Sequence, residues 1–85
     1  MLNPRAAALE ESISLILRES LSVEVPSLDA DLIALGTLDS LMLVDLLVRI
    51  EEMTGVMLSI ESIDLADLRS VRSIGSLLHR RMGTS

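Results

Sequence analysis

The chain has 85 residues with no Cys, no Lys and no Phe, Tyr or Trp, and 49% of it is apolar. Without cysteine there is neither a disulfide framework nor a thiolate nucleophile, and without lysine there is neither a Schiff-base lysine nor a P-loop lysine. This length predicts one small domain spanning residues 1–85, whose core must be built from aliphatic side chains.

The formal net charge of −6 is unevenly distributed. All 13 acids and three of the seven arginines fall in residues 1–68, which carry −10, whereas residues 69–85 carry +4. The strongly acidic residues 1–68 would repel phosphate backbones and anionic lipids. We therefore expect neither nucleic acid nor a membrane as a partner. The longest apolar run, residues 41–44, is far shorter than the roughly 20 residues of a membrane span, and the first residues lack signal-peptide features. We therefore expect a cytoplasmic protein.

The first predicted helix spans residues 4–20, with Asn3 as its N-cap and Pro4 at its first helical position. Its apolar residues recur at helical spacing: Leu9, Ile13, Ile16 and Leu17. Residues 21–39 follow as a long loop whose interspersed apolar side chains predict that it packs onto the helices, with a helical turn at residues 31–35. Loops of this length in compact domains tend to be functional.

The second predicted helix spans residues 40–54 and ends at Gly55, a suitable C-terminal stop. We expect its core side to be formed by Leu43, Val44, Leu47, Ile50 and Met53. Apolar residues extend around more than one face of this helix, because Leu41, Met42, Leu46 and Val48 cannot all point into the same core. Some apolar surface is therefore expected to be exposed.

Val56, Leu58 and Ile60 alternate like a strand, but no second strand is available to pair with them, so an extended loop is expected. Residues 64–68 predict a short helix, and Ser70 is expected to cap a last helix. The inward residues of this last helix are predicted to be Val71, Ile74, Leu78 and Met82. The fold class is thus all-α, a small four-helix bundle of three main helices and one short helix.

A catalytic serine requires a nearby base, and the only histidine, His79, lies in a run typical of a charged helix end. We therefore favour a solvated His79 over a Ser40–His79 hydrolase, and we expect no enzyme activity. Asp29, Asp31 and Asp39 lack the glycine and spacing of a calcium loop. No metal site is predicted.

Ser40 lies where the long loop turns into the second helix. Unpaired N–H groups and the helix dipole favour negative charge at that end, so a phosphodiester on the hydroxyl would be tolerated. The simpler interpretation is that Ser40 or Asp39 caps the helix, which contributes about 1 kcal/mol.

The triplet Asp39-Ser40-Leu41 occurs together with Gly36, a long apolar loop before it, and Val44, Leu47 and Ile50 behind it. This combination resembles the acyl carrier and peptidyl carrier protein family, and the resemblance covers nearly the whole chain. The "GTLDSL" and "LRSVRSI" segments are more similar to stand-alone carriers of specialised metabolism, or to aminoacyl and D-alanyl carriers, than to the fatty-acid carrier.

The resemblance implies that Ser40 is the attachment point of 4′-phosphopantetheine. A phosphopantetheinyl transferase would place the group there with coenzyme A as donor. The arm would then hold an acyl or aminoacyl group as a thioester, which a loading ligase supplies and downstream biosynthetic enzymes use. The resemblance itself names neither the cargo nor the pathway. We expect a monomer.

By the same resemblance, Asp39 and Leu41 would help partners to recognise the modified serine, while Asp45, Glu51 and Glu52 would meet basic patches on them. Met42 replaces the acidic residue usual in fatty-acid carriers, and with Leu46 it makes the start of this helix apolar, which favours a partner with a hydrophobic groove. The alternative function is an unmodified interaction module that docks other proteins through exposed Leu41, Met42 and Leu46.

Overall fold

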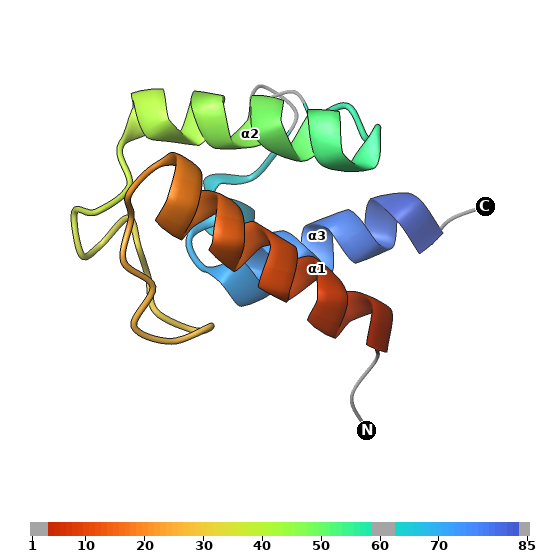
Figure 1. The fold of residues 1–85 in the computed structure, drawn as a ribbon, viewed down its shortest axis with the longest axis horizontal. Coiled ribbons are helices and arrows are strands. Elements are labelled where there is room, and N and C mark those ends of the chain that lie inside the picture. Colours follow the sequence, from red (N-terminus) through yellow and green to blue (C-terminus); the bar gives the residue numbers. More distant parts are fainter. Residues whose placement is uncertain (1–3, 59–62, 84–85) are drawn as a thin grey trace.

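The computed structural model describes residues 4–58 and 63–83, which form helices joined by irregular segments around one aliphatic core (Figure 1). The elements in chain order are helix α1 (Pro4–Leu15), a π-helical turn η1 (Ile16–Ser20), helix α2 (Ser40–Thr54), a 3-10 helix η3 (Leu65–Leu68) and helix α3 (Val71–Gly83). The described residues contain no strand, and the predicted small helical bundle is confirmed. Asn3 and Ile60, for which a cap and an extended position were predicted, lie outside the described residues.

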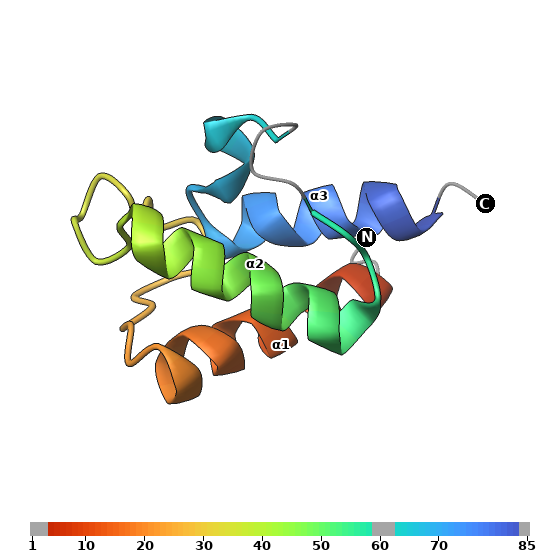
Figure 2. The same ribbon diagram turned by 90° about the horizontal axis from the view of Figure 1, so that it is seen from above.

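The three main helices pack on one another so that α2 lies across the pair formed by α1 and α3 (Figure 1). Seen from above, α2 has α1 on one side and α3 on the other (Figure 2). In both views, the long loop after η1 and the first turn of α2 lie at the end of the bundle opposite the last turn of α3. Ser40 is therefore presented at one tip of the molecule.

The predicted first helix is confirmed over residues 4–20, but its last turn is π-helical, which the sequence did not indicate. Leu9, Ile13 and Leu17 are buried at four-residue spacing and form its core stripe. The Leu21 N–H donates to the Ile16 carbonyl at 3.2 Å, five residues back, and the Val23 N–H donates to the Leu17 carbonyl at 2.7 Å. Widening the last turn in this way brings Val23 into the core.

Helix α2 has the predicted limits, because both of its ends are determined locally. Asp39 caps its first turn, and Gly55 ends it in the left-handed conformation at φ 75°, with the Gly55 N–H donating to the Glu51 carbonyl at 2.7 Å. A side chain at that φ would be strained, so glycine suits the position.

The face of α2 that is buried differs from the predicted one. The core stripe consists of Leu43, Leu46, Leu47 and Ile50. The predictions that Val44 and Met53 are buried and that Leu46 is exposed were wrong: Val44 and Met53 are 48% and 41% exposed, and Leu46 is 0% exposed. Because apolar residues surround this helix, several stripes with helical spacing compete, and contact with α1 and α3 decides among them.

The C-terminal part of the chain follows the predicted order, with η3 at residues 65–68 and α3 after Ser70. Ser70 caps α3 reciprocally, since the Ser73 N–H donates to Ser70 Oγ at 3.1 Å and the Ser70 N–H donates to Ser73 Oγ at 3.0 Å. Val71, Ile74 and Leu78 are buried as predicted. The prediction for Met82 was wrong: it is 37% exposed, because the last turn of α3 extends past the core.

Candidate functional site

Ser40 occupies the first helical position of α2, and the residue before it caps the helix. Asp39 has extended backbone angles, and its Oδ1 accepts from the Met42 N–H at 2.9 Å. The sequence left open whether Ser40 or Asp39 is the cap, and the structure assigns this role to Asp39. No described residue makes a hydrogen bond with the exposed Ser40 hydroxyl. The serine oxygen is therefore available to react.

Two buried leucines fix the chain on either side of Ser40. Leu38 is 2% exposed and Leu43 is 4% exposed, so the backbone is anchored in the core two residues before the serine and three residues after it. Between these anchors the chain must turn outward, which leaves Asp39, Ser40 and Leu41 exposed. The predicted Asp39-Ser40-Leu41 triplet thus lies at the surface because the buried residues on either side of it hold the chain in the core.

The loop before Ser40 is folded around the carbonyl of Leu32, a fully buried residue. This oxygen accepts from the backbone N–H groups of Thr37 and Leu38 and from Thr37 Oγ1, each at 3.1 Å. Gly36 takes the left-handed conformation at φ 77° that closes the turn. The predicted turn at residues 31–35 is present, since the Leu35 N–H donates to the Asp31 carbonyl at 3.0 Å.

Asp31 holds this turn and also reaches Arg69, which lies between η3 and α3. Its Oδ1 accepts from the Ala34 N–H at 2.9 Å, and its Oδ2 pairs with Arg69 Nη1 at 2.8 Å. The hydrogen bond from Ala34 and then the one from Arg69 lower the pKa of the Asp31 carboxyl below its ordinary value of 3.8. The carboxylate is therefore charged, and it works as a structural link.

An apolar stripe runs along α2 from the Ser40 end. Leu41, Val44 and Val48 recur at helical spacing on the solvent side, with exposures of 82%, 48% and 50%. Met42, predicted to be exposed, is only partly accessible and packs against the core. Of the three residues predicted to form an apolar docking patch, Leu41 is fully available, Met42 is partly available and Leu46 is buried.

Of the predicted acidic contacts on α2, one is already paired, and the other two lie at the far end of the helix, where Glu51 lines a groove together with Val44 and Val48. Asp45 Oδ1 accepts from Arg49 Nε at 3.2 Å, one turn further along the same helix. Glu51 and Glu52 are exposed, but they lie in the last turn of α2, about 17 Å from Ser40 along the helix axis. Next to the serine the exposed side chains are thus one acid, Asp39, and apolar Leu41, whereas Glu51 and Glu52 lie at the far end of the helix.

The structure does not bring the only histidine to Ser40. His79 lies in the second half of α3, and both views place this part of α3 at the opposite end of the bundle from the first turn of α2 (Figures 1 and 2). Across residues 4–58 and 63–83, no three His, Cys, Asp or Glu side chains lie close enough together to hold a metal ion. No described helix is long and apolar enough to cross a membrane.

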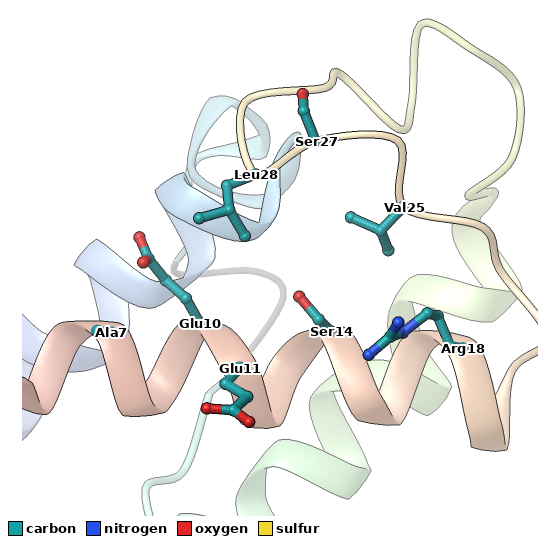
Figure 3. Close-up of a pocket in the computed structure, with 8 residues that line it drawn as sticks. All are labelled: Ala7, Glu10, Glu11, Ser14, Arg18, Val25, Ser27 and Leu28. Atoms are coloured by element: carbon teal, nitrogen blue, oxygen red, sulfur yellow. The ribbon is translucent and has the colours of Figure 1, made fainter.

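A groove of about 470 Å³ lies between α1 and the beginning of the long loop (Figure 3). Glu10, Ser14 and Arg18 line it from α1 and η1, and Val25 and Leu28 line it from the loop. None of its lining residues comes from α2. This groove is thus separate from the Ser40 surface.

A family model described as the phosphopantetheine attachment site matches residues 9–78. The chain belongs to this family. Its members carry 4′-phosphopantetheine covalently on a serine, so the predicted carrier family and its cofactor are confirmed. Comparisons with curated proteins and with solved structures gave no match.

The residues around Ser40 fit such a group. The hydroxyl is exposed and not used by the cap, and α2 is long enough, at 15 residues, to present a full dipole at its N-terminus. The first N–H groups of a helix have no partner within it, so the N–H groups of Ser40 and Leu41 are suited to a phosphodiester oxygen. The phosphopantetheine carrier thus has a serine whose surroundings accept the phosphate.

Proposed function

We propose that this carrier protein bears its phosphopantetheine on Ser40. The observation that supports this most is the division of roles at the start of α2, where Asp39 caps the helix and the Ser40 hydroxyl remains exposed with no described partner. A helix-start serine used as its own cap would have its oxygen held against the backbone. Here the hydroxyl is exposed and makes no hydrogen bond with a described residue, so it is accessible to another protein's active site.

The transfer forms a bond between Ser40 Oγ and a phosphorus of coenzyme A. The phosphorus–oxygen bond of the coenzyme's pyrophosphate breaks, the nucleotide part leaves, and the serine proton passes to a base. Because His79 lies at the far end of the bundle, we assign that base to the phosphopantetheinyl transferase. The chain's own contribution is to hold the hydroxyl outward at a fixed helix end.

When attached, the arm supplies a thiol that carries an acyl or aminoacyl group as a thioester. A loading ligase and downstream biosynthetic enzymes act on that group, and the chain presents it to them without catalysing the reaction. We propose that the cargo and the partners belong to a stand-alone specialised or aminoacyl pathway, and that the protein works as a cytoplasmic monomer without binding nucleic acid or membranes.

Partners recognise the modified serine through the exposed side of α2. Leu41 and the two valines that continue its stripe, Val44 and Val48, offer apolar contact beside the serine. Asp39 adds a charge at the helix end, while Asp45, Glu51 and Glu52 form a polar rim. Apolar contacts close to the serine would supply most of the affinity, and rim charges would mainly affect the rate of encounter.

The proposal is tested by intact-mass analysis after incubation with coenzyme A and a broad-specificity transferase. We expect the wild type to gain one phosphopantetheine unit and Ser40→Ala to gain none. Ser27→Ala is the matched control, since Ser27 is an exposed loop serine outside any predicted site, and it should be modified like the wild type. Equal modification of the wild type and Ser40→Ala would contradict the proposal.

The unmodified interaction module remains the second candidate function, favoured by the 82% exposure of Leu41. It predicts that partner binding is the same with and without the arm. A carrier predicts that Ser40→Ala abolishes turnover by a cognate ligase, whereas a docking module would be unaffected by Ser40→Ala and impaired by Leu41→Ser.

A further inference from the structure

The loop that leads to Ser40 is tied to the beginning of α3, far away in the sequence. The Leu32 N–H donates to the Arg69 carbonyl at 2.8 Å, and the Arg72 N–H donates to the Leu28 carbonyl at 3.0 Å. These two backbone bonds connect residues 28–32 with residues 69–72. A side-chain pair makes the same connection, since Arg72 Nε lies 3.3 Å from Asp29 Oδ1 of the loop.

The shortest of these side-chain links is the ion pair between Asp31 and Arg69, at 2.8 Å. The second oxygen of the same carboxylate accepts from the Ala34 N–H and thereby shapes the turn at residues 31–36. One side chain thus joins the turn to the segment that connects η3 with α3. Losing the charge of either partner would loosen the loop without removing an apolar side chain from the core.

The link continues to the start of α2 through Leu32, whose side chain is fully buried. The Leu32 N–H donates to the Arg69 carbonyl, and the Leu32 carbonyl accepts from the N–H groups of Thr37 and Leu38. Leu38 is followed by the cap Asp39, and Asp39 by Ser40. From Arg69 to the serine there is therefore a continuous path of hydrogen bonds and adjacent residues.

From this path we propose that Asp31 and Arg69 are positioning residues for Ser40: their ion pair holds the preceding loop in the position in which the transferase accepts the serine. The proposal rests on Ser40 being the attachment site. Neither side chain contacts Ser40, so the effect passes through the Leu32 carbonyl and the turn.

A loosened loop would place Ser40 correctly for only part of the time. The apparent affinity of a partner falls in proportion to the fraction of molecules in the competent conformation, so KM for the carrier rises while kcat is retained. An exposed ion pair changes such a population by up to about five-fold. A purely structural role would instead lower stability and leave KM unchanged for the molecules that remain folded.

The experiment measures kcat and KM for transfer of phosphopantetheine to the full chain with a broad-specificity transferase. Asp31→Asn keeps an oxygen for the Ala34 N–H but loses the charge that faces Arg69, and Arg69→Gln removes the other partner. Asp67→Asn is the matched control, because it breaks the 3.4 Å pair with Arg80, which does not involve the loop. Circular dichroism confirms that all variants are folded at the assay temperature.

We expect Asp31→Asn and Arg69→Gln each to raise KM above that of Asp67→Asn, by at most about five-fold, with kcat within about two-fold. The double variant should be no worse than the poorer single variant, because the two side chains form one link. Amide exchange at Thr37 and Leu38 should accelerate by a similar factor.

Two negative results are distinguishable. A wild-type chain that the transferase leaves unmodified would overturn the assignment of Ser40, and the positioning proposal with it. A wild type that is modified normally, with KM values for Asp31→Asn and Arg69→Gln equal to that of Asp67→Asn, would overturn the positioning proposal alone.

Discussion

Replacing Asp39 by alanine separates the structural role of this residue from a role in recognition. Its Oδ1 accepts from the Met42 N–H at 2.9 Å, and this is the side-chain cap of α2. Removing an N-cap costs about 1 kcal/mol of the free energy of unfolding. Asparagine caps nearly as well as aspartate, so Asp39→Asn keeps the bond while it removes the charge.

The chain contains neither Trp nor Tyr, so unfolding in urea is best followed by far-UV circular dichroism. Small domains have m-values at the lower end of about 1–3 kcal/mol/M in urea. A loss of about 1 kcal/mol therefore lowers the midpoint for Asp39→Ala by roughly 0.5–1 M relative to the wild type. Asp39→Asn should unfold within about 0.2 M of the wild type, because a few tenths of a kcal/mol is the spread among good caps.

Equal urea midpoints for Asp39→Ala and the wild type would refute the assignment of Asp39 as the cap. The transfer assay then addresses recognition. If Asp39→Asn, with its cap intact, is modified as fast as the wild type, the carboxylate charge contributes nothing to docking. If Asp39→Asn is as stable as the wild type but is modified more slowly, the transferase recognises the carboxylate charge, as the family resemblance implies.

Four further variants test the core, the exposed face of α2, a helix end and the loop. Leu46→Ala should lower the free energy of unfolding by about 2–5 kcal/mol because the side chain is fully buried, whereas Leu41→Ala should change it by less than about 0.5 kcal/mol, both measured in urea. Gly55→Ala should cost about 1 kcal/mol by the same measurement because φ is 75° there; an unchanged midpoint would contradict the left-handed stop. Asp31→Asn should be less stable than the wild type above pH 3.8, and this difference should vanish as the pH falls through the lower pKa of the folded state; a difference that grows in acid would reverse the sign of the pKa shift.

The limits of the helices could be predicted from sequence because their ends depend on nearby residues. Asp39 caps the N-terminus of α2, and Gly55 ends the helix. Ser70 caps α3 together with Ser73, three residues away. These interactions need only the local backbone, so the residue type at one position is informative. The position of Ser40 at a helix start followed from the same local signals.

The buried face of α2 could not be predicted in the same way. Leu46 and Val44 are both apolar and both fit helical stripes, yet only Leu46 is buried in the core. That choice depends on how whole helices pack, and no residue near α2 in sequence decides it. The error affected the predicted site, because it placed Leu46 in the docking surface and left Val44 out of it.

The ties between the loop and α3 could not be read from sequence either. Asp31 and Arg69 are 38 residues apart, and many acids and arginines in the chain could have paired with them. The sequence indicated that the loop packs onto the helices, because apolar residues are interspersed along it. Which charged groups hold it required the three-dimensional structure.

The central claim is that Ser40 carries the phosphopantetheine, and it is tested most directly by locating the modification. Cleavage after Arg18 and Arg49 releases residues 19–49, a peptide that contains four serines: Ser20, Ser22, Ser27 and Ser40. Fragmentation of this peptide from the transferase-treated wild type should place the whole added mass on Ser40. Added mass on Ser20, Ser22 or Ser27, or on a peptide outside residues 19–49, would contradict the account.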